Sequence, residues 1–385
     1  MKKNVTESVF YVGVDDKTLD LFEGQYIIPN GVSYNSYVIM DDKIAIMDMV
    51  DKRAAKDWFH NLDEVLGDKQ PDYLIISHLE PDHSANLSEV LQKYPDIKLV
   101  SNAKLFGMLP NFFEVPVKER SVVVNEGDTL ELGKHTLNFV MAPMVHWPEV
   151  MVTYEQTDKI LFSADGFGKF GALDTEEDWA CEARRYYFNI VGKYGMPVQT
   201  LLKKAAALDI QIICPLHGPV LSENLEYYIG KYQVWSSYEP EDKGVFIAYS
   251  SLHGNTAQAA KELAQMLEKQ GVEKVAISDL AREDMAECIE DAFRYDRLVV
   301  AAPTYDGAVM PVMTDFIHHL KLKTYQNRKV AFIENGSWAP MSGKLMKEQF
   351  EAMKNITIVD PVVTIRSTVK DAARQNLMKL AEALA

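Results

Sequence analysis

The sequence has 385 residues, more than a single hydrophobic core usually serves, and this length predicts two domains. Its composition, with 47% hydrophobic and 25% charged residues, is typical of a soluble globular protein. The net charge of -16 argues against nucleic-acid binding, because a phosphate backbone is bound by clustered Lys and Arg, which are not in excess here.

The sequence shows no targeting or membrane segment. Residues 1–7 lack the apolar core of a signal peptide, and no apolar run approaches the roughly 20 residues that span a bilayer. The three cysteines, Cys181, Cys214 and Cys288, are far apart and odd in number, which fits a reducing compartment and excludes a disulfide framework. Without a CxxC pair, no rubredoxin-like or zinc-ribbon module is expected. These features predict a cytoplasmic protein that binds neither membranes nor nucleic acids.

Short strands and one helix are predicted before the first polar cluster. Residues 36–40 and 44–47 read as a hairpin around the polar turn 41–43. Residues 52–66 carry apolar side chains at a four-residue spacing, which predicts a helix packed on a sheet. An apolar run at 73–76 then predicts a buried strand.

Four potential metal ligands follow this strand directly. They are His78, Glu80, Asp82 and His83. A buried strand commonly delivers polar side chains to the loop at its end, and the odd spacing suits a loop around a metal better than one face of a helix. Pro81 shapes the backbone between the two carboxylates.

Three later stretches of predicted strand also lead to a potential ligand. They are 121–140, followed by His146; 160–165, ending in Asp165; and 210–214, followed by His217. A lone histidine is more often a packed core residue than a ligand, and Asp165 alone fits a turn or cap equally well. Four strands that all end in His, Glu or Asp together predict one metal site.

A polar segment at 236–244 breaks both the helical and the strand periodicity and marks the predicted boundary between domains 1–243 and 244–385. The second domain begins with a strand at 245–249, a loop of hydroxyl and glycine residues, and a helix with one apolar face. Backbone N–H groups, hydroxyls and the helix dipole converge at such a loop, which predicts an anion site. The loop is neither a Walker motif nor a GxGxxG fingerprint.

Two later loops also follow predicted strands of this domain. They are residues 302–307, after the strand 297–301, and residues 334–340, after the strand 330–333. Each lies at the carboxyl end of a strand, where an open α/β sheet binds its ligand. Each offers one aromatic side chain, Tyr305 or Trp338, that could face a flat ring.

Together these motifs resemble the flavodiiron protein family, in its minimal two-domain form and over the whole chain. The first half resembles the metallo-β-lactamase-like domain of that family, with Glu80 where the general metallo-β-lactamase pattern has histidine. A carboxylate in place of an imidazole makes a site harder, which suits iron better than zinc. The resemblance implies an α/β and α+β architecture: an N-terminal αββα sandwich, followed by a flavodoxin-like doubly wound parallel sheet.

The resemblance implies a site with two irons and seven ligands. One iron would take His78, Glu80 and His146, the other would take Asp82, His83 and His217, and Asp165 would bridge them. The metals of binuclear sites lie about 3.5–4 Å apart. Trp147 could wall the pocket and Tyr194 could donate a hydrogen bond to the ligand shell, although packing alone would also account for both. Gln25 occupies a position where some family members have a histidine.

The loop after residue 249 resembles the phosphate loop of flavodoxin, which implies an FMN site. The implied contacts are Ser251, Leu252, His253, Gly254, Asn255 and Thr256 in that loop, and Pro303, Thr304, Tyr305, Asp306, Gly307, Ser337 and Trp338 in the two later loops. Tyr305 and Trp338 are the candidates to face the flavin ring. A capped helix without any ligand is the alternative for the first loop.

The implied function is the reduction of dioxygen to water, of nitric oxide to nitrous oxide, or of both gases. Electrons would pass through FMN from an external carrier, such as a rubredoxin, to the two irons. The family also implies a head-to-tail homodimer, or a dimer of such dimers, with the FMN of one subunit beside the irons of the other. The preferred gas, the donor, the flavin potential and the filling of the site by iron or zinc stay open.

Two other functional classes stay open as well. A zinc hydrolase fused to a flavodoxin would use the same two folds, although Glu80 and the full set of seven ligands argue against it. A flavin-bearing redox sensor with a structural metal site is the non-enzymatic alternative. It predicts no gas consumption beyond that of free FMN.

Overall fold

The structure is a computed structural model that describes residues 3–385 and divides into two compact units. Within the described residues, the first unit contains residues 3–186 and Met196–Gln233, and the second contains Tyr187–Gly195 and Val234–Ala385. A short segment of the N-terminal half thus belongs to the second unit. The domain boundary between residues 243 and 244 stays a prediction, and the first two residues of the predicted N-terminal segment lie outside the described part.

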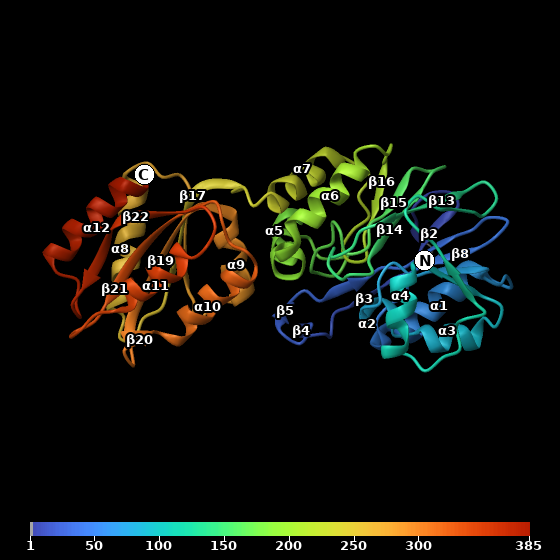
Figure 1. Ribbon diagram of the computed structural model, residues 1–385, viewed down its shortest axis with the longest axis horizontal. Helices are drawn as coiled ribbons and strands as arrows, with labels where there is room; N and C mark the ends of the chain where they lie inside the picture. Colours follow the sequence, from blue (N-terminus) through green and yellow to red (C-terminus); the bar gives the residue numbers. More distant parts are fainter. Residues whose placement is uncertain (1–2) are drawn as a thin grey trace. The chain divides into compact units, whose positions relative to one another are not determined.

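Two sheets form most of the first unit (Figure 1), with the strand orders β1-β2-β7-β8-β9-β10-β11 and β12-β13-β14-β15-β16. The strands of the seven-stranded sheet are β1 (Lys3–Asn4), β2 (Val9–Tyr11), β7 (Tyr37–Ile39), β8 (Ala45–Met47), β9 (Tyr73–Ile75), β10 (Lys98–Ser101) and β11 (Ser121–Val123). Those of the five-stranded sheet are β12 (Thr129–Glu131), β13 (Thr136–Met141), β14 (Met151–Glu155), β15 (Ile160–Phe162) and β16 (Ile212–Cys214). Two small pairs are β3 (Val14–Asp16) with β6 (Val32–Tyr34) and β4 (Leu21–Phe22) with β5 (Tyr26–Ile27).

Apolar side chains of the two sheets meet in one core. Tyr37, Met47 and Ile75 of the first sheet and Phe139 and Phe162 of the second are buried in the same cluster. Successive side chains of a strand point to opposite faces, so one face of each sheet can supply this core while the other packs against helices. The result is a sandwich with its strand ends free to carry polar groups.

Helices cover the outside of this sandwich, with α1 and α3 on one side and α6 and α7 on the other (Figure 1). The helices of the first unit are α1 (Ala55–Leu66), α2 (Pro81–Ser84), α3 (Leu87–Lys93), α4 (Ala103–Met108), α5 (Trp179–Tyr186), α6 (Gly195–Ala205) and α7 (Leu225–Ser236). In α1, Trp58, Leu62 and Val65 are buried at helical spacing, so this helix has the apolar stripe that a sheet-covering helix needs.

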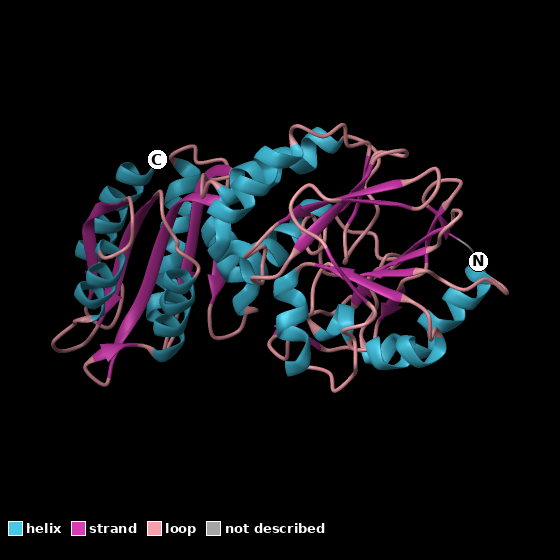
Figure 2. Ribbon diagram, turned by 45° about the vertical axis from the view of Figure 1, so that its right-hand side comes forward, coloured by secondary structure: helices cyan, strands magenta, loops and turns pink. Residues whose placement is uncertain are grey.

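A parallel sheet with the order β18-β17-β19-β21-β22 forms the centre of the second unit. This is the doubly wound order of the flavodoxin-like folds. Its strands are β17 (Asp242–Tyr249), β18 (Val275–Asp279), β19 (Tyr295–Tyr305), β21 (Arg328–Asn335) and β22 (Ile356–Ile365), and β20 (Ala308–Val309) pairs antiparallel with β19. Helices lie on both faces of this sheet (Figure 2).

The helices of the second unit are α8 (Asn255–Lys269), α9 (Met285–Arg294), α10 (Pro311–Leu322), α11 (Ser342–Glu351) and α12 (Asp371–Leu384). In Figure 1, α8 and α12 lie on one side of the sheet, and α9 and α10 lie on the other. Leu263 and Leu267 of α8 and Leu377 and Leu380 of α12 are buried against Val299 of β19, so both helices share one core with the sheet.

The predicted fold class is confirmed for both halves, and two local predictions are wrong. Pro81–Ser84 form a helical turn, α2, so Asp82 and His83 do not lie in an open loop. The predicted loop 302–307 is mostly strand, because β19 continues to Tyr305 and pairs with β20. In residues 3–385, no helix is both long and apolar enough to cross a membrane.

Candidate cofactor pocket and metal centre

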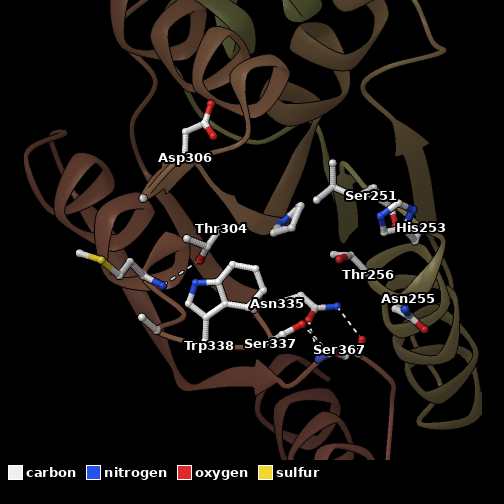
Figure 3. A pocket seen from close by; sticks show the side chains of 16 residues that line it. Ser251, His253, Asn255, Thr256, Thr304, Asp306, Asn335, Ser337, Trp338 and Ser367 are labelled. Carbon is white, nitrogen blue, oxygen red and sulfur yellow. Dashed lines mark hydrogen bonds between the residues drawn. The ribbon is translucent and has the colours of Figure 1, made fainter.

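A cavity of about 550 Å³ opens beyond the carboxyl ends of the strands in the second unit (Figure 3). Here β17 ends at Tyr249, α8 begins at Asn255, and Gly254 between them has a φ of 87°, which favours glycine. The Gly254 N–H donates to Ser251 Oγ over 3.1 Å. This loop therefore leads directly to a helix N-terminus, where free backbone N–H groups and the helix dipole favour an anion.

Most of the predicted FMN contacts line this cavity. The lining residues are Ser251, Leu252, His253, Asn255, Thr256, Pro303, Thr304, Asp306, Gly307, Asn335, Gly336, Ser337, Trp338, Ala339, Met341 and Ser367. Two predicted contacts, Gly254 and Tyr305, are absent from this lining. Asn335 lies in the predicted loop 334–340, although it was not among the predicted contacts. Ser367 was missed, because β22 ends without a motif that points to a ligand.

Hydrogen bonds hold the loops around the cavity in place. Asn335 Nδ2 donates to the Ser367 carbonyl over 2.9 Å, and the Ser367 N–H donates back to Asn335 Oδ1 over 3.1 Å. Thr304 Oγ1 accepts from the N–H groups of Met341 and Ser342 over 2.8 and 3.1 Å. The end of β21 is thus tied to the segment after β22, and the end of β19 is tied to the start of α11.

An aromatic ring lies beside the cavity and is free to cover a flat ligand. Trp338 is 82% exposed, and its indole points toward the space between the three loops (Figure 3). Ligand pockets of small molecules and cofactors occupy roughly 300–1,000 Å³, so the cavity volume fits a cofactor. An anion-binding loop at one side and an exposed indole at the other fit a phosphate and a flat ring, as in FMN.

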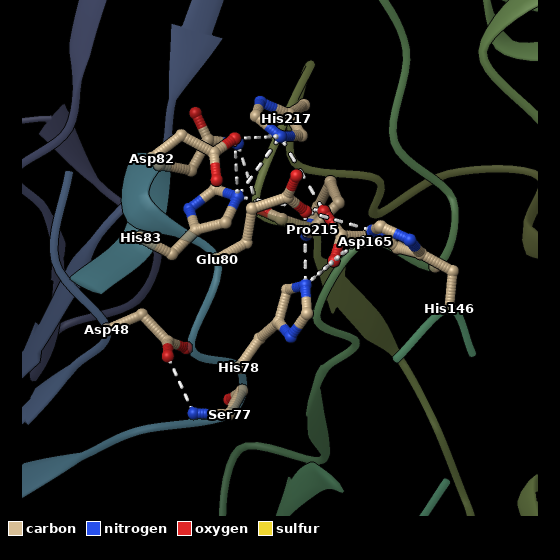
Figure 4. Close-up of polar contacts among 12 residues, drawn as sticks. Asp48, Ser77, His78, Glu80, Asp82, His83, His146, Asp165, Pro215 and His217 are labelled. Carbon is tan, nitrogen blue, oxygen red and sulfur yellow. Dashed lines mark hydrogen bonds and ion pairs between the residues drawn. The ribbon is translucent and has the colours of Figure 1, made fainter. Parts of the chain in front are cut away.

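In the first unit, the segment after β9 is fixed before it reaches the candidate ligands (Figure 4). The buried Asp48 carboxylate accepts a hydrogen bond from the Ser77 N–H over 2.7 Å. Burial raises the pKa of Asp48 to about 6. Pro81 then occupies the first turn of α2, where its fixed φ is already helical, and this turn presents Asp82 and His83 side by side.

The seven candidate ligands form two groups, and the first surrounds His78. Its Nε2 lies 3.2 Å from Glu80 Oε2, and His146 Nε2 lies 3.1 Å from the same oxygen. Asp165 Oδ2 lies 3.7 Å from His78 Nε2 and 3.8 Å from His146 Nε2. Two imidazoles and two carboxylates therefore converge on one point.

The second group shares the other oxygen of Asp165. Asp82 Oδ2 lies 3.3 Å from the Nε2 atoms of both His83 and His217. Asp165 Oδ1 lies 3.6 Å from each of these two nitrogens. One carboxylate thus contributes one oxygen to each group, which is the arrangement of a bridging ligand.

These distances fit a metal better than direct hydrogen bonding. Ligand atoms about 2.1 Å from a common metal lie roughly 3.0–3.4 Å apart at tetrahedral or octahedral angles. Both carboxylate oxygens of Asp82, His146 Nε2 and Asp165 Oδ2 are buried without a hydrogen-bond partner among residues 3–385. Buried polar atoms without partners are rare in native proteins, and a pair of metal ions would satisfy all four.

The local electrostatics also favour positive charge. Burial alone would lower the pKa of His78, but its hydrogen bond to Glu149 raises that pKa well above the usual value. Burial alone would lower the pKa of His83, yet the Asp82 carboxylate raises it to about 9. Burial alone would raise the pKa of Asp165, whereas the adjacent histidines hold it well below its usual range. A cation is therefore stabilised here, whether it is a proton or a metal ion.

Three further contacts orient the candidate ligands. His78 Nδ1 lies 2.9 Å from Glu149 Oε1, and His217 Nδ1 lies 2.8 Å from the Ser33 carbonyl, so each Nε2 is left to face the group centre. Tyr186 donates its hydroxyl to Asp165 Oδ1 over 2.9 Å. Sequence reasoning missed all three contacts. Only the position of Glu149, three residues after a predicted ligand, offered a signal.

Aromatic rings enclose the two groups. The ring of Trp147 lies edge-on to that of His78 at 4.9 Å, and the ring of Phe22 lies edge-on to that of His217 at 5.4 Å. Trp147 contacts the first ligand group but is absent from the lining of the cavity beside it, so its predicted role as a pocket wall stays a prediction. Tyr194 belongs to the second unit and makes no described contact with the seven residues, so its predicted role stays untested.

A smaller cavity of about 280 Å³ opens beside the candidate ligands Glu80 and Asp82. Its lining consists of Leu19, Leu21, Phe22, Glu23, Gly24, Tyr34, Asp51, Glu80, Pro81 and Asp82. Apolar side chains and carboxylates share this wall. The cavity therefore gives a small molecule a path to the ligand groups that passes both apolar and acidic side chains.

A third group of titratable side chains, His135, Glu155 and Asp158, lies elsewhere in the first unit. His135 Nδ1 lies 2.8 Å from Asp41 Oδ2, and His135 Nε2 lies 2.8 Å from Ser8 Oγ. Glu155 accepts from the backbone N–H groups of Thr157 and Asp158. These polar groups are satisfied by neighbouring side chains and backbone groups, which indicates a structural role.

Two family models match the chain on either side of the predicted boundary. The ODP family beta lactamase model matches residues 32–218, and a flavodoxin domain model matches residues 246–358. The seven candidate ligands lie in the first range, and the loops around the larger cavity, up to residue 341, lie in the second.

Curated relatives span almost the whole chain. An uncharacterized protein of Methanocaldococcus jannaschii is 28% identical over 96% of this chain and 95% of its own length. The anaerobic nitric oxide reductase flavorubredoxin of Klebsiella pneumoniae is 27% identical over 96% of this chain and 81% of its own length.

Solved structures share the fold of both halves. The rubredoxin:oxygen oxidoreductase of Desulfovibrio gigas has a TM-score of 0.93 at 24% identity and covers 100% of this chain and 98% of its own. The flavodiiron protein of Giardia intestinalis has a TM-score of 0.88 at 23% identity and covers 100% of this chain and 97% of its own. At these identities the likeness concerns the fold.

Proposed function

Because the chain belongs to the flavodiiron protein family, we propose that it is an oxidoreductase that reduces dioxygen to water, nitric oxide to nitrous oxide, or both. The reaction takes place at a non-haem diiron site, and electrons reach it through FMN from an external donor. Family membership, the names of the relatives and the donor set of the first unit all support this proposal.

One observation carries the proposal: Asp165 directs one oxygen to each of two ligand groups. A bridging carboxylate is expected where two metals act together on one substrate. The donor set contains the carboxylates of Glu80, Asp82 and Asp165 beside four imidazoles. Hard carboxylate oxygens with imidazole nitrogens suit iron, whereas a zinc site of this fold would need fewer carboxylates.

When bound, the iron pair supplies redox-active Lewis-acid centres and FMN supplies electrons one at a time. The side chains of this protein hold, orient and shield these groups. Glu149 and the Ser33 carbonyl fix which nitrogen of His78 and of His217 faces the metals, and Tyr186 holds the bridging carboxylate. Trp147 excludes water from the first ligand group. The smaller cavity gives a gas molecule access at Glu80.

The flavin would be held by groups that the second unit already fixes. The N-terminus of α8 and Ser251 would bind the phosphate, and Trp338 would cover the ring system. Asn335 and Ser367 would keep their mutual hydrogen bonds and provide a rigid floor. FMN binding would therefore need little rearrangement of the protein.

The proposal extends to partners and location. A small rubredoxin-type protein would deliver electrons, and a head-to-tail homodimer, or a dimer of such dimers, would bring the FMN of one subunit beside the irons of the other. We place the protein in the cytoplasm. The name of the Desulfovibrio gigas structure supports the donor type, and three scattered cysteines support a reducing compartment.

Anaerobic stopped-flow mixing tests the function. The iron- and FMN-loaded protein, reduced by a rubredoxin and its reductase, is mixed separately with dioxygen and with nitric oxide while the flavin absorbance is followed. Fast reoxidation by either gas is expected, and the ratio of the two rates ranks the substrates. His146→Ala should slow the reaction at least about 100-fold, because it removes one ligand from a buried site.

Two other outcomes would replace the proposal. Equal and slow oxidation of the wild-type protein and the His146→Ala variant would mean that the flavin reacts alone, as in a redox sensor. Metal analysis that finds zinc, together with esterase or lactamase activity, would favour a hydrolase. A matched Asp20→Asn variant, at an exposed position outside the cavity lining, controls for a general effect of losing charge near the site.

A further inference from the structure

The hairpin β4–β5 carries a carboxylate to the open side of the ligand groups. Its turn contains Glu23 and Gly24, with φ values of 49° and 67°. Space around Gly24 is open, so the backbone conformation and not packing requires glycine there. Phe22 anchors the hairpin, because its buried ring packs against His217. The backbone of the next residue, Glu23, is therefore held near the ligand groups, while its side chain is exposed.

Glu23 lies within ligand distance of the first group. One ligand atom from each of Glu23, Glu80 and His146 lies within 4.8 Å of the other two. Gln25 Nε2 lies 3.3 Å from Glu23 Oε2, so this glutamine contacts the carboxylate. The hairpin thus offers Glu23 to the cluster, whereas sequence reasoning had considered Gln25.

A second observation points to a ligand at this place. His146 is 7% exposed, and its Nε2 has no hydrogen-bond partner in the described chain, although it lies 3.1 Å from Glu80 Oε2. Glu23 and Glu80 both line the smaller cavity. The open face of the first group is therefore bounded by a buried imidazole on one side and by an exposed, movable carboxylate on the other.

The charges at the site favour an additional anion. Two ferrous ions carry four positive charges, and Glu80, Asp82 and Asp165 supply three negative ones, so one positive charge remains in a buried site. Burying a net charge is costly, and a nearby opposite charge lowers that cost. An ionised Glu23 would make the reduced site neutral. Oxidation would leave excess positive charge, which the same carboxylate would stabilise.

We propose that Glu23 is a displaceable ligand of the metal held by His78, Glu80 and His146. Glu23 would cover the open side of this ligand group when no gas is bound, and its exposed side chain would turn away when substrate enters from the smaller cavity, while buried Phe22 keeps the hairpin backbone in place. The identity of the substrate rests on the function proposed above, whereas the metal contact does not.

Release of metal to a chelator tests this assignment without any gas. Full-length protein is loaded with two equivalents of Co²⁺, and the two ions are removed by a chelator while the visible absorption is followed. In Glu23→Gln, which keeps the size of the side chain but not its charge, one ion should leave at least about 10-fold faster, and the other should leave at the wild-type rate. Glu23→His should restore slow release, because it supplies a new ligand atom.

Asp20→Asn is the matched control. Asp20 is an exposed carboxylate three positions earlier and is absent from the cavity lining. Its replacement should leave both release rates unchanged. Equal release from Glu23→Gln and wild type would overturn the proposal. It would also be overturned if Asp20→Asn matched Glu23→Gln, or if Glu23→His released metal as fast as Glu23→Gln, because a general charge effect would then suffice.

A redox titration of the iron-loaded protein gives an independent readout. Loss of the anion should shift the midpoint potential of the iron pair in Glu23→Gln to a more positive value, and Asp20→Asn should leave it unchanged. An unchanged potential in Glu23→Gln would count against the proposal. If the wild-type protein reduces neither gas but Glu23→Gln still releases cobalt faster, the proposed function is rejected and the assignment of Glu23 as a metal ligand stands.

Discussion

The polar atoms of the two sites are satisfied in different ways. At the ligand groups of the first unit, Asp82, His146 and Asp165 keep buried atoms without hydrogen-bond partners in the described chain. At the larger cavity of the second unit, Asn335 and Ser367 bond to each other, and Thr304 bonds to the start of α11. The polar atoms of the first site thus need cations as partners, whereas those of the loops around the larger cavity already form hydrogen bonds within the protein.

This difference predicts which cofactor contributes to the stability of the folded protein. Buried carboxylates and imidazoles without partners cost free energy, so metal ions should contribute to the stability of the first unit itself. A pocket whose walls are tied to one another should persist after its ligand has left. Metal loss and flavin loss should therefore have unequal structural consequences.

The largest expected effect comes from the shared carboxylate. Asp165→Asn removes the negative charge from both ligand groups at once, so both metals should bind poorly and gas reduction should fall by more than about 100-fold. Iron analysis and stopped-flow kinetics would measure this. Iron binding with normal stoichiometry in the variant would show that the two groups do not depend on a common bridge.

Removal of the cofactors one at a time tests the comparison directly. Metal removal should destabilise the first unit by about 4 kcal/mol, the contribution of a ligand present at a thousand times its Kd. Calorimetry should therefore show the thermal transition of that unit lowered by roughly 8–16 °C. Flavin removal should leave the circular dichroism of the protein unchanged. A larger loss of structure on flavin removal would reverse the distinction.

A smaller effect is expected at the residue that orients His78. Glu149→Gln keeps the shape of the side chain but weakens its hydrogen bond to the imidazole, so metal affinity should fall about 10- to 100-fold. Chelator competition measures this change. Glu131→Gln, at an exposed position on β12, should bind metal as the wild type does.

A weaker effect is expected in the flavin pocket. Trp338→Ala should raise the Kd of FMN about 2- to 10-fold, because an aromatic contact contributes roughly 0.5–1.5 kcal/mol. Tyr305→Ala should change it less, since Tyr305 is absent from the cavity lining. Quenching of FMN fluorescence gives both constants. A larger effect at Tyr305 would restore the sequence-based expectation that this ring faces the flavin.

The smallest expected effect is on stability, at the hydrogen-bonded pair Asp41 and His135. Burial alone would raise the pKa of Asp41, but hydrogen bonds from the His135 backbone and ring hold it below its usual value of 3.8. The stability that ionised Asp41 supplies is therefore present above pH 3.8 and lost as the pH falls through the lowered pKa. Asp41→Asn should cost about 1 kcal/mol at pH 7 and less at pH 3, by urea unfolding. An equal cost at both pH values would contradict this ionisation.

Much of the architecture could be predicted, because strand ends carry a strong signal. The apolar runs at 73–76 and 160–165 predicted β9 and β15 and the polar residues after them. The structure brings all seven predicted ligands together, although their assignment to metals remains a prediction. Residues such as Glu149 and Tyr186 could not be found, since a side chain that orients another has no pattern of its own.

Local geometry set the other limit of prediction. The strand β19 extends through Pro303 to Tyr305, where it pairs with β20. This extension could not be predicted, because β20 (Ala308–Val309) has only two residues and shows no strand pattern. Helix α2 was missed because four residues cannot show helical periodicity. On the hairpin β4–β5, the resemblance directed attention to Gln25, and it gave no sign that Glu23 has a carboxylate oxygen within 4.8 Å of ligand atoms of Glu80 and His146.

The short segment from His78 to His83 has a consequence for how the protein acquires its metals. Its first two candidate ligands belong to one group and its last two to the other, and Asp165 touches both groups from the opposite side. A displacement of this one segment therefore moves half of each site. The two ions should load as a cooperative pair, so a half-filled population should stay small throughout a titration.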